Sequence, residues 1–186
     1  MASETGICNR ALQILGANRI TSLADLNSKS ARECSVAYEP LRDALLRSHP
    51  WSFAITRVQL AEDVSPPIGA DHQYTLPADA LRVLPNNDFT NDWVIEGRKI
   101  LTNWSSPLTV RYIKLVTDPN LMDSLFRETL SGQIAAEICE ALTGSNTKQA
   151  LIAQRVTLTL ALAFRTGGME QRPDDGVDSG WVEAGN

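Results

Sequence analysis

One segment near the end of this 186-residue chain constrains the fold more than any other, because it is apolar on every side. Ten of the fourteen residues at positions 151–164 are apolar, and the pattern predicts a helix over about residues 147–166. A helix on the surface of a globular protein shows a polar half, and a domain of about four helices is too small to enclose such a helix. We therefore expect one face to pack on the subunit's own core and another face to meet a neighbouring subunit. The side chains expected at that contact are Leu151, Val156, Leu158, Leu160, Leu162 and Phe164.

Three further helices are predicted from apolar residues that recur at three- and four-residue steps. Ser3 is the expected N-cap of the first helix, and Gly16 its left-handed end. The second helix covers about residues 30–47 and contains Pro40, which we expect to kink it and to bring it into the lateral contacts. His49 follows the end of this helix, where the nearby carbonyls favour partial positive charge. In the third helix, the residues expected close to a single face are Leu121, Leu125, Ile134, Ile138 and Leu142.

Between the second and third helices the hydrophobic period changes to two, which is typical of half-buried strands. Residues 53–60 alternate in this way, and shorter strands are predicted at 73–76 and 81–84. Two more short strands flank Gly97, which supplies the positive φ of a hairpin turn, and a last strand is predicted at 108–116. This part of the chain is expected to form one small antiparallel sheet.

These patterns predict an α+β protein: a mainly helical domain of about four helices with an inserted small antiparallel β lobe and an extended C-terminal arm. The predicted organisation is an N-terminal helical pair at residues 1–52, a β-rich inserted lobe at 53–117, a C-terminal helical pair at 118–168, and an extended acidic arm at 169–186.

The predicted arm carries almost all of the net charge of −5. It has five acidic residues and one basic residue, so the first 168 residues are close to neutral. Its apolar anchor is Trp181 with Val182, in a segment otherwise rich in glycine and acids. Since aromatic residues dominate the hot spots of interfaces, Trp181 is a candidate docking residue; the alternative is that it folds back on its own domain.

Composition and motifs exclude several classes of function. A nucleic-acid-binding module normally carries a strong positive balance, which this chain lacks. No apolar stretch reaches the ~20 residues of a membrane span, and the first residues do not form a secretion signal. Cys8, Cys34 and Cys139 are too few and too widely spaced for a disulfide framework, so we expect them to be buried as small hydrophobic side chains.

The sequence also lacks the spacing patterns of common active sites. It contains no phosphate-binding loop, no GxGxxG, no HExxH and no GxSxG, and its two histidines lie in different elements without a second ligand at zinc spacing. We therefore predict no catalytic residue, no cofactor and no metal. The alternative of a peptidoglycan-degrading enzyme would need a carboxylate in a cleft, for which the candidates are Glu33, Glu137 and Glu140.

Four segments together resemble one known family. They are ICNRALQILG at residues 7–16 with ITSL at 20–23, YEPLRDALLRSHPWSFA at 38–54, YTLPADALRVL at 74–84, and DSGWV at 178–182. In this order, and over nearly the whole chain, they are similar to the head-to-tail adaptor proteins of short-tailed bacteriophages, the tail tubular protein A family. The segment at 38–54 is the most specific of the four.

This resemblance implies a structural virion protein that forms a twelve-fold ring beneath the portal and continues the DNA channel into the tail. The implied partners are the portal protein, a downstream tail or nozzle protein, other copies of the chain, and double-stranded DNA that passes without sequence-specific binding. By the same resemblance, the arm would reach the portal through Asp178, Trp181 and Val182, and the protein would be assembled in the host cytoplasm and reside in the neck of the virion. The alternatives are the lytic enzyme and a non-viral helical scaffolding protein, because four-helix folds serve many roles.

Overall fold

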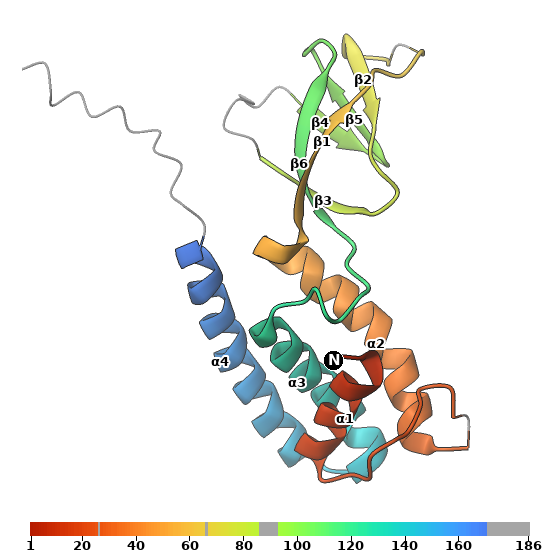
Figure 1. Ribbon diagram of the computed structural model, residues 1–186, viewed down its shortest axis with the longest axis vertical. Coiled ribbons are helices and arrows are strands. Elements are labelled where there is room, and N and C mark those ends of the chain that lie inside the picture. Colours follow the sequence, from red (N-terminus) through yellow and green to blue (C-terminus); the bar gives the residue numbers. More distant parts are fainter. Residues whose placement is uncertain (26, 66, 86–92, 171–186) are drawn as a thin grey trace, which may run out of the picture.

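The structure is a computed structural model that describes residues 1–25, 27–65, 67–85 and 93–170. It is an α+β protein in which four helices lie at one end and a β lobe, inserted between α2 and α3, lies at the other (Figure 1). The helices are α1 (Glu4–Leu15), α2 (Lys29–Ser48), α3 (Ser124–Thr143) and α4 (Asn146–Glu170). The predicted fold class and the predicted order of elements are therefore confirmed.

Local sequence signals define helix ends, and both ends of α1 lie where they were predicted. The Ser3 side chain accepts a hydrogen bond from the Gly6 backbone N–H at 3.0 Å, which caps α1, and Gly16 ends that helix with φ of +67°. Asp123 caps α3 by accepting from the backbone N–H groups of Leu125 and Phe126. The helix α4 is longer than predicted and includes residues 169 and 170, which the sequence assigned to the arm.

The central helix is α3, which has α1, α2 and α4 packed around it (Figure 1). Of the residues expected on one face of this helix, Ile134 and Ile138 are buried and Leu125 and Leu142 pack against the main core. Burial extends beyond these residues, because the small residues Ser131, Gly132 and Ala135 are also enclosed. The Ser131 hydroxyl donates to the Arg127 carbonyl at 2.8 Å, so its burial leaves no polar atom unpaired. Leu121, expected on this helix, precedes it and is 59% exposed.

The β lobe contains two three-stranded antiparallel sheets, not the single sheet expected. One has the order β1-β6-β3, formed by Ile55–Leu60, Leu108–Lys114 and Ala80–Leu84; the other has the order β2-β5-β4, formed by His72–Thr75, Lys99–Thr102 and Trp93–Glu96. Gly97, with φ of +60°, makes the predicted hairpin turn between β4 and β5. Residues of both sheets form one apolar cluster around the buried Tyr74 and Ile100. The strands form two sheets because two sheets can enclose this cluster between them.

An aromatic cluster lies where the helical body meets the β lobe. Trp51, which follows α2, packs edge-to-face on Phe126 of α3 at 5.0 Å between ring centroids and donates its indole N–H to the Leu45 carbonyl. Phe53 also packs on Phe126, and Phe164 of α4 lies beside Trp51. The turn that carries the chain from α2 into β1 is therefore part of the main core.

Candidate interaction surface

The outer face of α4 carries the largest unpartnered side chains on this helix. Leu151, Leu158 and Leu162 are 63%, 73% and 53% exposed. Their spacing of seven and four residues places them on one side of the helix. Figure 1 shows this helix along the outside of the bundle, next to α3. We call these three residues the leucine stripe.

The other three residues predicted at a subunit contact lie on the inner side of α4. Val156, Leu160 and Phe164 are half-buried and pack against the main core of their own subunit. The structure therefore divides the apolar excess of this helix between two faces, one facing its own core and one facing outward. Sequence reasoning did not separate them because it gave no helical phase to the six residues.

A close approach between α3 and α4 fixes the position of the inner face. A Cβ atom at Gly132 would lie 2.7 Å from Cγ2 of Val156, so only glycine permits this spacing. Along the same contact, the Gln149 side-chain amide donates to the Ala136 carbonyl at 3.1 Å, and the Lys148 ammonium donates to the Leu15 carbonyl at the end of α1. These contacts determine which side of α4 remains outside.

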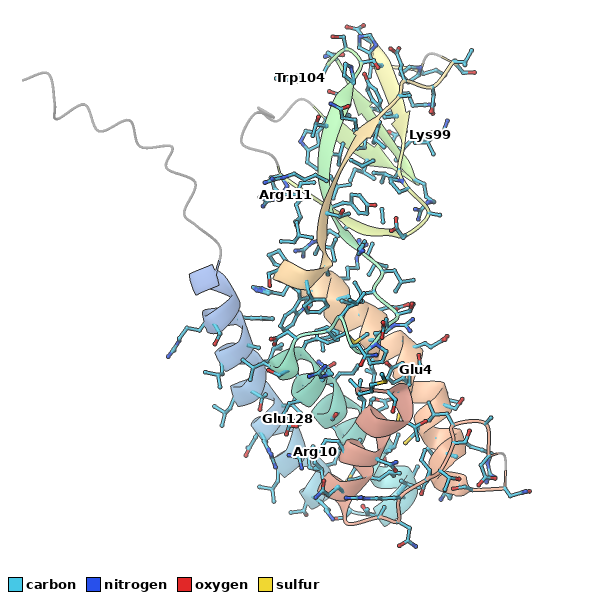
Figure 2. All side chains as sticks on the ribbon, viewed as in Figure 1. Glu4, Arg10, Lys99, Trp104, Arg111 and Glu128 are labelled. Carbon is cyan, nitrogen blue, oxygen red and sulfur yellow. The ribbon has the colours of Figure 1, made fainter. Side chains whose placement is uncertain are left out.

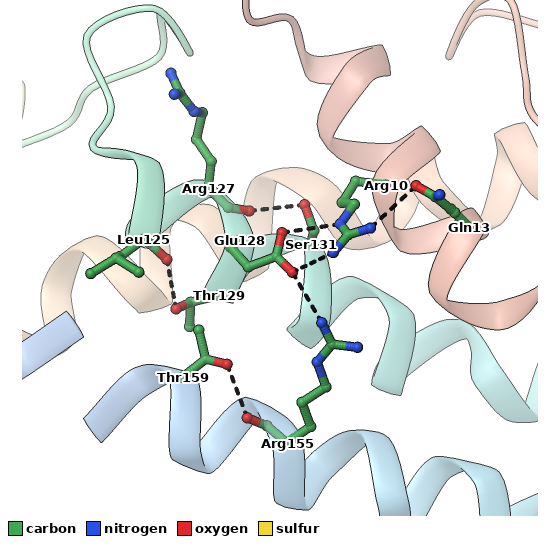
Figure 3. A network of polar contacts seen from close by, with 9 residues as sticks. All are labelled: Arg10, Gln13, Leu125, Arg127, Glu128, Thr129, Ser131, Arg155 and Thr159. Carbon is green, nitrogen blue, oxygen red and sulfur yellow. Dashed lines mark hydrogen bonds and ion pairs between the residues drawn. The ribbon is translucent and has the colours of Figure 1, made fainter. Parts of the chain in front are cut away.

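An ion-pair network joins three helices beside this contact (Figure 3). Both Glu128 carboxylate oxygens of α3 accept hydrogen bonds from Arg10 of α1, at 2.8 and 3.0 Å. Arg155 of α4 donates to the same carboxylate at 3.4 Å. The Arg10 guanidinium holds the pKa of Glu128 below its usual value. Figure 2 places Arg10 and Glu128 together in the helical end, far from Lys99 and Trp104 in the β lobe. No sequence motif indicated this network.

His49, the residue that follows the C-terminal end of α2, stacks on Phe164 of α4, with 4.1 Å between ring centroids and 19° between ring planes. Burial, together with the nearby Arg82 guanidinium, lowers the pKa of His49. The predicted preference for positive charge is therefore wrong, because burial between aromatic rings outweighs the helix-end carbonyls. Its Nε2 atom is buried and has no hydrogen-bond partner among the residues that the structure describes.

A groove lies between α3 and α4 and reaches Leu41 of α2. It has a volume of about 510 Å³. Leu41 of α2, Ala136 and Glu137 of α3, and Ala150, Ala153 and Val156 of α4 contribute to its walls. Sequence reasoning missed this groove, since its alanines on α3 and α4 form a surface only when the helices are packed.

The charges on the two surfaces differ in sign. Between residues 146 and 169, α4 has three basic residues, Lys148, Arg155 and Arg165, and no acid. On α3, Glu137 and Glu140 are exposed. Of the three candidates for an enzymatic carboxylate, Glu137 lines the groove. Glu140 is exposed on α3, and Glu33 is half-exposed on α2.

The remaining candidate chemistry of the described residues is structural. Cys8, Cys34 and Cys139 are free and buried, as predicted, and the hydrogen bond with Cys34 and burial raise the pKa of the Cys8 thiol. Over the ranges that the structure covers, no three His, Cys, Asp or Glu side chains are grouped to hold a metal ion. None of the helices described is both long and apolar enough to cross a membrane. Asp178, Trp181 and Val182, predicted to bind the portal, lie outside the described residues.

Comparison with known proteins gives no assignment. Neither a scan against models of protein families nor a search of curated proteins finds a match to this chain.

Proposed function

We propose that this protein is a structural head-to-tail adaptor of a short-tailed bacteriophage, without catalytic activity. Copies of it would form a ring that joins the portal to the tail and continues the DNA channel. The observation that carries the proposal is the leucine stripe, because three large apolar side chains aligned on one exposed helix face are typical of a protein interaction site.

The segment with the most specific resemblance has a clear structural role. Residues 38–54 form the second half of α2, the turn at His49 to Trp51, and the entry to β1. Trp51 and Phe53 of this segment build the aromatic cluster that joins the β lobe to the helical body. A resemblance located in this junction supports a shared architecture, a helical body with an inserted lobe, which is what the adaptor family implies.

The proposed partners follow from the same resemblance. The ring, expected to be dodecameric, would bind the portal through the arm with Asp178, Trp181 and Val182, and a tail or nozzle protein on its other side. The first 168 residues are close to neutral. A channel wall of this charge does not bind phosphates strongly, so it suits the passage of double-stranded DNA.

Native mass spectrometry of the purified protein, alone and with its portal protein, tests the proposal. We expect several copies to bind each portal ring. Leu158→Asp should lower this occupancy at least about ten-fold, because it introduces an unpaired charge at an apolar contact. Leu121→Asp is the matched control, since Leu121 is similarly exposed but lies before α3. A protein that remains monomeric with the portal present would contradict the proposal.

A further inference from the structure

We propose that the leucine stripe of one copy docks into the groove between α2, α3 and α4 of the next copy, so that the chain associates head to tail with itself. This inference rests on the proposed self-assembly and specifies which two surfaces meet. The occupant of the groove is thus a second copy of this chain, presenting the outer face of its α4.

The sizes of the two surfaces are compatible. An apolar cavity of about 150 Å³ accommodates a benzene-sized group, and a leucine side chain is smaller than benzene. The groove, with about 510 Å³, exceeds the volume of three such side chains, and its lining mixes apolar residues with the polar Gln133, Asn146 and Gln149. Ala136, Ala150 and Ala153 leave this space because their side chains end at Cβ. Leu41 and Val156 supply larger apolar walls on which the inserted side chains would pack.

The charges of the two surfaces are complementary. The stripe lies on a helix whose charged residues between 146 and 169 are all basic, and Arg165 is exposed close to Leu162. Of the residues described along the groove, Glu137 is the charged one. Docking brings Arg165 of one copy toward Glu137 of the next, whereas in a pair of stripes Arg165 meets no acid of the partner's α4, whose charged residues between 146 and 169 are all basic. The complementarity therefore favours the groove over a symmetric pair of stripes.

The positions of the two surfaces give the contact a direction. The stripe and the groove are different parts of the same subunit, so each copy can insert its stripe into one neighbour while receiving the stripe of another. A contact of this kind is heterologous, and it generates a closed ring when the rotation between copies closes. The geometry of the single chain thus provides the two unlike surfaces that ring formation requires.

Disulfide trapping between two variants that each carry one introduced cysteine tests this contact. Leu158→Cys places a thiol on the stripe and Ala150→Cys places one in the groove, on exposed positions, while the three native cysteines are buried. The two variants, one carrying a mass tag, are mixed and oxidised with copper phenanthroline. We expect the mixed disulfide to exceed the Leu158→Cys homodimer about ten-fold, the ratio that 1.4 kcal/mol produces. Leu121→Cys mixed with Ala150→Cys is the control and should give no mixed disulfide.

Three results would overturn the inference. A Leu158→Cys homodimer as abundant as the mixed species would show that stripes pack on one another. If no disulfide is trapped but native mass spectrometry of the same samples detects oligomers or copies on the portal, the contact lies elsewhere. The proposed function would then still stand. No disulfide and no assembly, even with the portal, would reject both the docking and the proposed function.

Discussion

At the scale of single residues, Gly132 determines how closely α4 approaches the central helix. Alanine has a higher helix propensity than glycine by about 1 kcal/mol. At position 132 a steric clash opposes this gain in helix propensity, because the new Cβ would lie 2.7 Å from Cγ2 of Val156. Val156 is β-branched and has little rotamer freedom in a helix, so it cannot turn away cheaply. Steric contact therefore outweighs propensity here.

We predict that Gly132→Ala lowers the free energy of unfolding by about 1–2 kcal/mol, because the overpacked contact forces α4 outward. Urea denaturation of dilute protein measures the change. The control is the same substitution in a Val156→Ala background, where space for the Cβ exists and the loss should disappear. An increase in stability in both backgrounds would show that the close approach does not constrain the helices.

A second residue-scale prediction concerns His49. Its folded-state pKa lies below its unfolded value, so the native state binds fewer protons than the unfolded state as pH falls below the ordinary histidine value of about 6.5. Its contribution to stability is therefore full above that value and is lost as pH falls toward the folded-state pKa. The facing groups are Arg82, whose charge opposes protonation, and the rings of Trp51 and Phe164.

Urea denaturation at pH of about 7.5 and about 5.5 checks this linkage. We expect wild-type protein to lose stability between the two, and His49→Phe, which keeps a ring on Phe164, to lose less. The second histidine, His72, is present in both proteins and pairs with Glu62 at 2.8 Å, so its effect cancels in the comparison. Equal losses in wild type and variant would remove His49 as the cause.

At the scale of elements, α4 has two apolar faces with different roles. Phe164 on the inner face stacks on His49 and lies 5.8 Å from the Trp51 ring, whereas Leu162 on the outer face is 53% exposed. The two residues are two positions apart in the same helix and similar in hydrophobicity. They therefore form a matched pair for separating folding from assembly.

We predict that Phe164→Ala lowers the free energy of unfolding of dilute protein by about 1–2 kcal/mol, through lost ring packing. Leu162→Ala should change it by less than about 0.5 kcal/mol, as is usual for exposed positions. In a self-association assay the order should reverse, with Leu162→Ala causing the larger loss. Equal effects of the two variants in both assays would mean that the faces are not distinct.

At the scale of the whole molecule, the helical body and the β lobe share one core at the aromatic cluster. This core also contains Leu84 and Ile113 of the lobe and Val116 of the segment that follows the lobe. The acidic residues after position 170 contribute most of the net charge but little apolar surface. In the proposed function, assembly through α4 and docking to the portal therefore use separate parts of the chain.

We predict that deletion of residues 171–186 leaves the thermal unfolding temperature nearly unchanged, because this segment is acidic and poor in apolar residues. The truncated protein should still give the stripe-to-groove disulfide but lose binding to the portal. Differential scanning calorimetry and portal co-sedimentation measure the two effects. Earlier melting or aggregation of the truncated protein would indicate that the segment belongs to the fold.

Features of this protein that depend on neighbouring residues could be predicted from local patterns of amino acids. Hydrophobic period, caps and turn glycines act within a few positions, so the order of helices and strands, the cap at Ser3 and the hairpin at Gly97 were predicted correctly. The apolar excess of residues 151–164 was also visible as composition.

Features that depend on how the helices pack could not be predicted in this way. Gly132 and Ala135 make α3 central because small side chains allow neighbours to approach, an effect that periodicity of large residues does not reveal. The same packing turns Val156, Leu160 and Phe164 inward and leaves the leucine stripe outside. It also opens the groove and brings Arg10 and Arg155 to Glu128. Some of these contacts join residues more than a hundred positions apart, so no local pattern encodes them.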